Sequence, residues 1–83
     1  MAVSIEYKAS VAKDLKGLDP QQRRRVLAKV ERVLREGAVQ AEALTGQFSG
    51  LYRIRAGDYR AIFARTGTGY LVLRIAHRRE VYR

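Results

Sequence analysis

Arginine recurs at short intervals in the second half of the chain, in a pattern that suits phosphate binding. Arg53 and Arg55 stand two residues apart, and Arg60 follows five residues later. A guanidinium group offers a planar fork of donors that grips a phosphate at two points and stacks on a nucleobase, whereas an ammonium group acts as a hydrated point charge. Because alternate residues of a strand share a face, Arg53 and Arg55 are expected on one cationic surface.

Groups that transfer protons are scarce around these arginines. The chain ends in HRREVYR, which contributes His77, Glu80 and Tyr82. Imidazole, carboxylate and phenol groups all serve as acids or bases in enzymes. No Ser or Thr stands in a His/Asp arrangement that would activate its hydroxyl. The residues therefore favour phosphate binding with limited proton transfer.

Each of these residues also has a structural interpretation. A pair such as Arg53 and Arg55 is typical of a solvated strand face. Arg60 is suited to pairing with Asp58 or with a backbone carbonyl, and Tyr82 to packing against the core. Only the combination of residues favours a site.

The composition supports an anionic partner and excludes several kinds of site. The 83 residues carry 17 Lys and Arg against 8 Asp and Glu, a formal net charge of +9. Such a charge favours RNA, DNA, an anionic membrane face or an acidic protein as the partner. With no Cys and one His, the chain has no disulfide framework and no zinc cluster, and it has no carboxylate cluster for Mg²⁺. We therefore expect no metal and no cofactor.

Length and hydropathy predict one domain, residues 1–83. No stretch of the sequence approaches the ~20 apolar residues that span a bilayer. The first residues lack the apolar core and cleavage site of a signal peptide. We expect a cytoplasmic protein with no membrane partner.

Two hydrophobic periods locate the elements. Alternation of apolar and polar residues predicts strands, and apolar spacings of three and four predict helices. The expected order is a strand (3–7), a helix (10–18), a helix from Asp19-Pro20 to near Gly37, a connection (38–50) and three strands (51–56, 59–65 and 70–76). Arg23–Arg25 on the second helix form either a solvated face or a secondary contact for a polyanion or a protein partner. The order β-α-α-β-β-β predicts an α+β domain with two helices on one face of an antiparallel sheet.

Three runs of sequence resemble one family. They are LTG at 44–46, GLYRIRAGDYRAIF at 50–63 and IAHRREVYR at 75–83. Together with the element order, they are similar to the RelE/ParE superfamily of toxins from type II toxin–antitoxin systems. The resemblance covers the whole chain and implies the RelE-like microbial RNase fold.

The RelE branch implies a ribosome-dependent mRNA interferase. Such a toxin cleaves mRNA in the ribosomal A site and is neutralised by an acidic antitoxin, which we expect to bind through a helical segment. Attack of a ribose 2′-OH on its own phosphate leaves a 2′,3′-cyclic phosphate and a 5′-OH end and requires no metal. The implied partners are thus the ribosome, mRNA and an antitoxin.

The resemblance also implies a role for individual residues. Arg55 and Arg60 would hold the scissile phosphate, Arg78 would stabilise the leaving oxygen, and Tyr82 would stack on a base or take the 2′-OH proton. The further RNA-binding residues are Arg53, His77, Arg79 and Arg83. RelE-type sites often carry Lys where this chain has Arg53 and Arg55, and a guanidinium keeps its proton, which argues against a base on this strand.

Two alternatives remain open. ParE-like members share the scaffold and the GDYR and HRxxVY stretches but act on DNA gyrase without known nuclease chemistry. A toxin homologue that still binds RNA but has lost catalysis is the other alternative. The shared motifs do not separate these interpretations.

Overall fold

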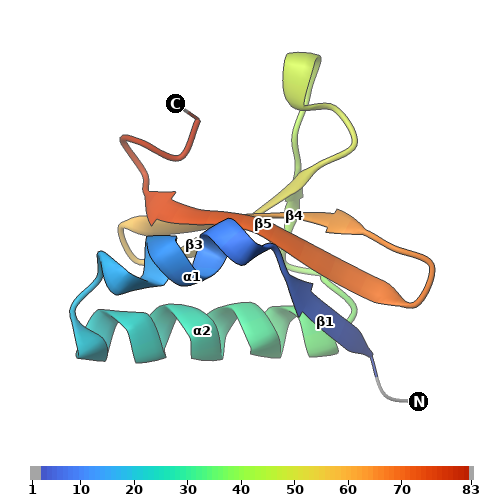
Figure 1. Ribbon diagram of the computed structural model, residues 1–83. Helices are drawn as coiled ribbons and strands as arrows, with labels where there is room; N and C mark the ends of the chain where they lie inside the picture. The colour runs from blue at the N-terminus through green and yellow to red at the C-terminus, as the bar shows by residue number, and fades with distance from the viewer. Residues whose placement is uncertain (1–2, 83) are drawn as a thin grey trace.

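The computed structural model describes residues 3–82. Its elements, in chain order, are β1 (Ser4–Tyr7), α1 (Ala9–Lys16), α2 (Pro20–Arg35), β2 (Glu42–Ala43), the 3₁₀ turn η1 (Gly46–Phe48), β3 (Tyr52–Ala56), β4 (Tyr59–Arg65) and β5 (Gly69–His77). Both helices lie on one side of the sheet, while the η1 loop and the C-terminal segment rise from the other side (Figure 1). The predicted α+β class is confirmed, and β2 is a short addition within the expected connection.

The sheet has the strand order β1-β5-β4-β3-β2. The three strands of the predicted meander are antiparallel, and the β3–β4 turn uses Gly57 at a φ of 63°. However, β1 pairs with β5 in parallel, so the prediction of a wholly antiparallel sheet is wrong at this edge. The two intervening helices return the chain so that β1 and β5 run in the same direction.

Gly69 allows β1 to approach β5 closely. Ser4 pairs with Gly69 at the start of the parallel ladder. A Cβ at position 69 would lie 1.9 Å from the backbone oxygen of Ser4, far inside van der Waals contact. Tyr7, at the other end of β1, donates a hydrogen bond of 3.0 Å from its hydroxyl to Glu31 on α2. β1 is therefore held both by the sheet and by a helix.

The start of α2 follows the sequence signal. The Asp19 carboxylate accepts hydrogen bonds from the backbone N–H groups of Gln21 and Gln22 at 2.9 and 3.1 Å, which satisfies donors that the first turn leaves free. Arg23 donates to the carbonyls of Leu15 and Leu18. This side chain therefore fixes the α1–α2 turn and does not belong to a solvated face.

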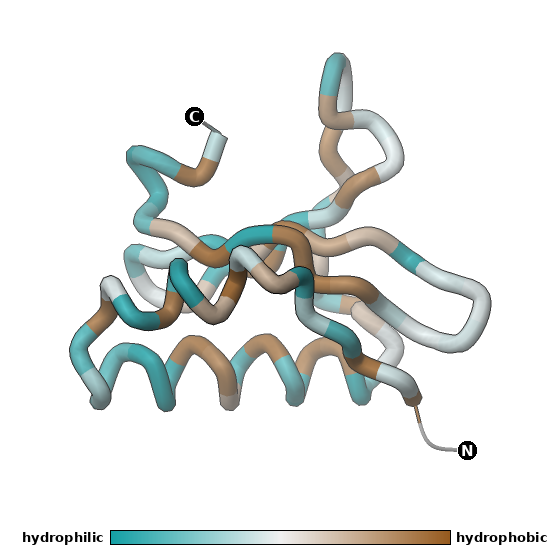
Figure 2. The backbone as a smooth tube through the Cα atoms, in the orientation of Figure 1, coloured by the Kyte–Doolittle hydropathy of each residue, from teal (hydrophilic) through white to brown (hydrophobic). Residues whose placement is uncertain are grey.

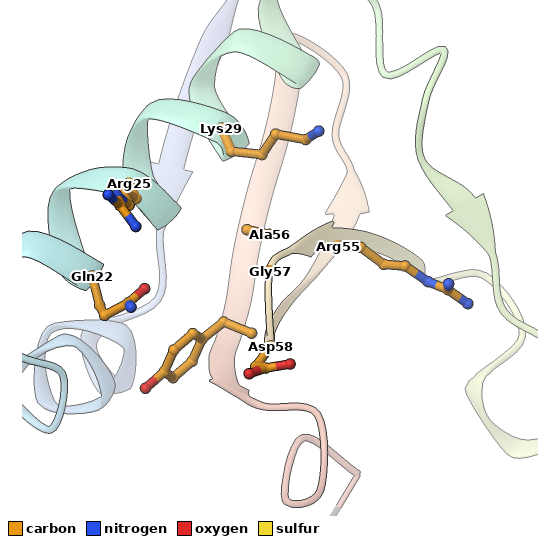
Figure 3. Close-up of a pocket in the computed structure, with 8 residues that line it drawn as sticks. Gln22, Arg25, Lys29, Arg55, Ala56, Gly57 and Asp58 are labelled. Carbon is orange, nitrogen blue, oxygen red and sulfur yellow. The ribbon is translucent and has the colours of Figure 1, made fainter.

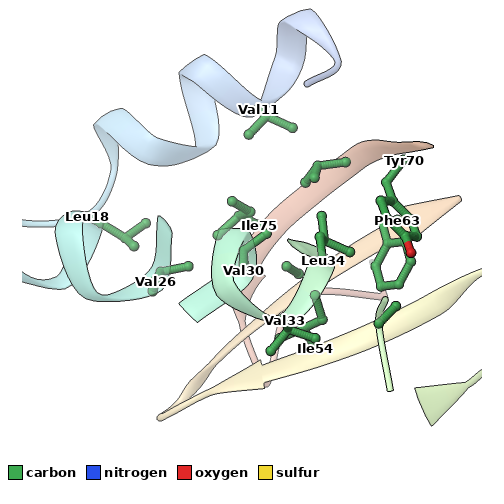
Figure 4. Packing of buried hydrophobic residues seen from close by; sticks show 13 residues of the cluster. Val11, Leu18, Val26, Val30, Val33, Leu34, Ile54, Phe63, Tyr70 and Ile75 are labelled. Atoms are coloured by element: carbon green, nitrogen blue, oxygen red, sulfur yellow. The ribbon is translucent and has the colours of Figure 1, made fainter. Parts of the chain in front are cut away.

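The core lies between the helices and the sheet. Hydrophobic positions of α2 face the strands along its length (Figure 2), and Val30 and Leu34 are completely buried. They pack with Ile54, Phe63 and Ile75 from three strands (Figure 4). Burial of this face contributes the main stabilisation of so small a domain. None of the helices within residues 3–82 is both long and apolar enough to cross a membrane.

The other face of the sheet is less open than the sequence predicts. Ile62 on β4 is 6% exposed although it points away from the helices, and Val81 is 4% exposed. A turn after β5, in which the N–H of Val81 donates to the carbonyl of His77, brings the C-terminal segment back over the sheet. A small second apolar cluster thus forms beside the charged residues of this face.

Candidate functional site

Strand pairing aligns charged residues in two rows on the face opposite the helices. Neighbours across antiparallel strands share a face. The first row runs through Glu42, Arg53, Ile62 and Arg74, and the second through Arg55, Arg60 and Ala76. Ile54, which stands between Arg53 and Arg55, is buried in the core, so the predicted alternation along this strand is confirmed.

Glu42 bridges two arginines of these rows. One carboxylate oxygen lies 2.6 Å from Nη2 of Arg53, and the other lies 3.1 Å from Nε of Arg55. The hydrogen bond from Arg53 holds the pKa of Glu42 below its ordinary value, and the positive charges of Arg53, Arg55 and Arg60 add to this effect. The same bond raises the pKa of Arg53. The carboxylate occupies the place where an external anion would meet both guanidinium groups.

Tyr82 reaches this face from the C-terminal segment and lies beside the arginine cluster, which consists of Arg53, Arg55, Arg60 and Arg78. Its hydroxyl accepts a hydrogen bond of 2.9 Å from Nη1 of Arg53. Its ring lies 5.2 Å from that of Phe48 in η1, and the residue is 41% exposed. The phenol is thus placed beside the arginines, and an exposed part of its ring is available to a ligand.

Arg60 is surrounded by positive charge. Burial is the largest cause that lowers the pKa of Arg60, and the positive charges of Arg55, Arg53 and Arg78 lower it further. The negative charge of Asp58 raises it. Arg60 therefore lies within electrostatic range of three other guanidinium groups. Nη1 of Arg60 also donates to the carbonyls of Gly57 and Tyr59, both at 2.8 Å. The backbone partner considered from the sequence is therefore present, and it fixes the side chain within the cluster.

Arg78 lies at the end of the cluster, against the β3–β4 turn. Its backbone N–H donates to the carbonyl of Asp58 at 2.8 Å. Its Nε lies 3.9 Å from the Asp58 carboxylate, and the side chain is 54% exposed. An exposed pair at this distance contributes little to stability. The Arg78 guanidinium is therefore only weakly held and can turn to a ligand.

Two of the other residues expected to bind RNA, His77 and Arg79, do not join the cluster in the structure. His77 pairs with Tyr59 on the side of the helices, and their rings meet edge to face at 5.7 Å. Its Nδ1 accepts a hydrogen bond from the N–H of Arg79. Arg79 itself is exposed, and its side chain makes no hydrogen bond and no ion pair within residues 3–82. Arg83 lies outside the described residues.

A bulge in β5 explains the position of His77. Phe63 pairs with Val72 and Ile62 pairs with Arg74, which leaves Leu73 as an extra residue. One extra residue reverses the alternation beyond it. His77 thereby shares the face of Ile75, which is buried.

An apolar pocket adjoins the arginine cluster. It has a volume of about 200 Å³. It is lined by Phe48, Leu51, Ile62, Leu73, Arg74, Val81 and Tyr82. Aromatic and aliphatic walls beside guanidinium groups suit a flat base attached to a phosphate.

Two residues of this face were missed from the sequence. Glu42 falls in a stretch with no periodicity, and only the β2–β3 pairing reveals its place. Arg74 is brought to the face by the bulge. Within residues 3–82, His, Asp and Glu side chains form no group of three that could hold a metal ion. The arrangement is suited to binding a phosphate by cations with a phenol at hand.

Comparison with known proteins identifies the family. The model of the ParE toxin of the type II toxin–antitoxin system parDE matches residues 5–82. A search of curated proteins gave no match. Among solved structures, the fold is similar to a chain of the RelBE2 toxin–antitoxin complex from Mycobacterium tuberculosis, with a TM-score of 0.83 and 20% identity over 93% of this chain and 99% of that chain.

Two further structures are similar over almost the whole chain. For the archaeal RelE–RelB complex from Pyrococcus horikoshii the TM-score is 0.73 at 25% identity, covering 98% of this chain and 100% of that chain. For the DinJ–YafQ toxin–antitoxin complex from E. coli it is 0.70 at 17% identity, covering 100% of both chains. These likenesses agree with the fold, and the family model spans nearly all of the described residues. The chain belongs to the ParE toxin family of type II toxin–antitoxin systems, within the RelE/ParE superfamily.

Proposed function

We propose that this toxin is a ribosome-dependent endoribonuclease that cleaves mRNA in the A site. The observation that carries the proposal is the gathering of Arg53, Arg55, Arg60 and Arg78 with the phenol of Tyr82 on one face of the sheet. Four positive charges, with the carboxylates of Glu42 and Asp58 beside them, complement the negative charge that develops on a phosphate during transesterification.

The proposed reaction is an intramolecular transfer at phosphorus. The ribose 2′-oxygen forms a bond to phosphorus while the bond to the 5′-oxygen of the next nucleotide breaks. The 2′-OH proton passes to the Tyr82 oxygen beside Arg53 as the phenol gives its own proton to solvent, and water held by Arg78 gives a proton to the departing 5′-oxygen. Arg55 and Arg60 hold the non-bridging oxygens. The products are a 2′,3′-cyclic phosphate and a 5′-OH end.

The entering phosphate has to displace Glu42 from Arg53 and Arg55. Both contacts of Glu42 are made by a half-exposed carboxylate, so their loss costs little free energy. The protein supplies few groups for proton transfer, and correct alignment of the 2′-OH with the P–O bond is a large part of the barrier. The ribosome is therefore the proposed source of the RNA geometry, and free RNA is cut slowly.

A protein antitoxin is the proposed inhibitor. The similar chains from M. tuberculosis and P. horikoshii were both solved in toxin–antitoxin complexes. The net charge of +9 attracts an acidic partner from solution, and the bound partner neutralises part of that charge. We propose that an acidic helical segment covers the arginine cluster or blocks entry to the ribosome in the cytoplasm.

Inhibition of DNA gyrase is the second candidate function. It is favoured by one observation, the match of residues 5–82 to the ParE toxin model. Under this alternative the arginine face serves recognition only, and no RNA is cut. A homologue that binds RNA without cutting it is the third outcome to be separated.

One pair of assays separates these functions. The protein is added to in vitro translation, and primer extension maps the ends of the message, while a parallel reaction measures gyrase supercoiling. Cuts in codon register with 5′-OH ends, abolished in Arg60→Ala, support the nuclease. Intact message with inhibited supercoiling overturns the nuclease in favour of the gyrase inhibitor. Intact message with active gyrase overturns both.

A further inference from the structure

A second pocket lies on the side of the molecule where α2 meets the β3–β4 hairpin. Its volume is about 350 Å³. Gln22, Arg25 and Lys29 line it from successive turns of α2, and residues 55–59 line it from the hairpin (Figure 3). Spacings of three and four residues place these α2 side chains on one face of the helix. The proposed reaction uses none of the three α2 residues.

The lining of this pocket has an excess of positive charge. It includes Arg25, Lys29 and Arg55 but one carboxylate, Asp58. Within residues 3–82, Arg25 and Lys29 make no hydrogen bond and no ion pair. Arg23, by contrast, is bound to two carbonyls of the α1–α2 turn. Two cations that hold no internal partner and face one cavity are suited to an external anion.

Arg55 connects this pocket to the arginine cluster. It lines the pocket, yet its Nε is paired with Glu42 on the cluster side. The strand β2 pairs only with Tyr52 and Arg53, so within residues 3–82 no strand pairs with this edge of β3 from Ile54 onward. A smaller cavity of about 110 Å³ that includes Lys29, Glu42 and Arg55 continues along this edge. Lys29 and Arg55 therefore line both cavities along the edge of the sheet, with Glu42 beside them.

We propose that the pocket between α2 and the hairpin binds a phosphodiester of the RNA strand next to the linkage held by the cluster. The inference rests on the proposed function and extends it by a second anion site. A ligand that contacts Arg55 both from the arginine cluster and from the pocket must carry several anionic groups along its length, as a nucleic acid backbone does. An acidic peptide is the competing occupant, and the test below separates the two.

Binding of RNA that resists cleavage tests the proposal. A 2′-O-methyl dodecamer and a 2′-O-methyl trinucleotide are titrated by fluorescence anisotropy against wild type and Arg25→Gln/Lys29→Gln. The matched control is Lys16→Gln/Arg24→Gln, which removes one Lys and one Arg that are exposed and do not line the pocket. All four side chains lie on the surface of their helices, so thermal unfolding should be unchanged.

The expected result depends on RNA length. For the dodecamer, the pocket variant loses about tenfold in affinity, and the slope of log K against log salt falls by about 0.7 to 1.4. The trinucleotide, which is too short to reach both sites, and the control pair change less than about twofold. Equal losses of dodecamer affinity in both double variants would show that binding depends only on the overall positive charge of the protein. This result would overturn the proposed site in the pocket. If the pocket variant lost affinity for a polyglutamate dodecamer to the same extent, the pocket would be assigned to acidic peptides. This result would overturn the proposed RNA site.

A second measurement on wild type does not depend on any variant. Backbone amide NMR shifts of Gln22, Arg25 and Lys29, which line the pocket from α2, should move with the dodecamer and stay in place with the trinucleotide; no shift with either would contradict the proposal. Because methylated RNA is not cut, binding is measured whether or not the protein is a nuclease. A protein that binds at the pocket but leaves ribosome-bound message intact overturns the proposed function alone.

Discussion

The Tyr82 hydroxyl accepts a hydrogen bond of 2.9 Å from the guanidinium of Arg53, across 29 residues of sequence. This contact joins the C-terminal segment to the middle of the sheet. Tyr82→Phe keeps the ring against Phe48 and removes only the hydroxyl. We expect cleavage of ribosome-bound message to fall about 10²-fold or more, with RNA affinity nearly unchanged. Single-turnover rates and anisotropy measure both, and a parental rate in Tyr82→Phe would remove the phenol from the mechanism.

Loss of one guanidinium from the cluster should slow cleavage strongly. Arg60 and Arg78 are near enough for the charge of one to lower the pKa of the other. Arg60→Ala and Arg78→Ala are each expected to reduce the rate about 10²-fold, as the loss of one transition-state contact commonly does. Arg24→Ala, an exposed residue of α2, is the control. If all three variants cut at the same rate, the cluster is not the reaction site.

Removal of the Glu42 carboxylate should strengthen the binding of RNA. Glu42→Gln frees Arg53 and Arg55 from their ion pairs. We expect RNA to bind about three- to tenfold more tightly, with a steeper dependence on salt. Glu36→Gln removes the same charge from a helix-surface pair with Arg32 and should have a much smaller effect. Weaker binding by Glu42→Gln would mean that the carboxylate orders the arginines and does not compete with the ligand.

Alkaline pH should weaken the attachment of β1. Burial and then the hydrogen bond to Glu31 raise the pKa of Tyr7 from 10.0 to about 12. A raised pKa in the folded state stabilises the protein fully below pH 10, and this contribution is lost as the pH rises toward 12. The Tm of wild type should therefore fall toward that of Tyr7→Phe over this interval. A constant difference in Tm from pH 9 to 12 would show that Tyr7 has an ordinary pKa.

The close pairing of β1 with β5 requires glycine at one position. Gly69→Ala would bring a Cβ against the backbone of Ser4, and overpacking of this kind costs about 1 to 3 kcal/mol. At Gly67, in the loop just before β5, nothing lies within 4 Å of an added Cβ, so Gly67→Ala should change stability by less than about 0.5 kcal/mol. Urea denaturation compares the two variants, and equal stabilities would argue against the tight approach.

Local features of the fold could be read from the sequence. The Asp19-Pro20 signal predicted the start of α2 because a cap and its bonds lie within four residues. Alternation predicted that Arg53 and Arg55 face away from Ile54, since a strand without a bulge keeps its period. The hairpin at Gly57 likewise depends on residues close in sequence.

Features that depend on distant residues could not be read in this way. The parallel pairing of β1 is decided by how the helices return the chain, and the position of Glu42 is decided by a two-residue strand without its own pattern. The extra residue Leu73 moves His77 to the side of the helices, and nothing near it in the sequence marks a bulge. Alternation within one strand therefore placed Arg53 and Arg55 correctly, whereas the positions of His77 and Glu42 depend on pairing between distant residues.

The Glu42 bridge makes the cluster a site with a built-in competitor. A tethered carboxylate stays at high effective concentration beside Arg53 and Arg55, whereas a small anion from solution must find them by diffusion. A polymer that is anchored at neighbouring points replaces the carboxylate more easily, because its next phosphate is tethered as well. Preference for long chains over free phosphate can therefore arise from this one side chain, without any shape recognition.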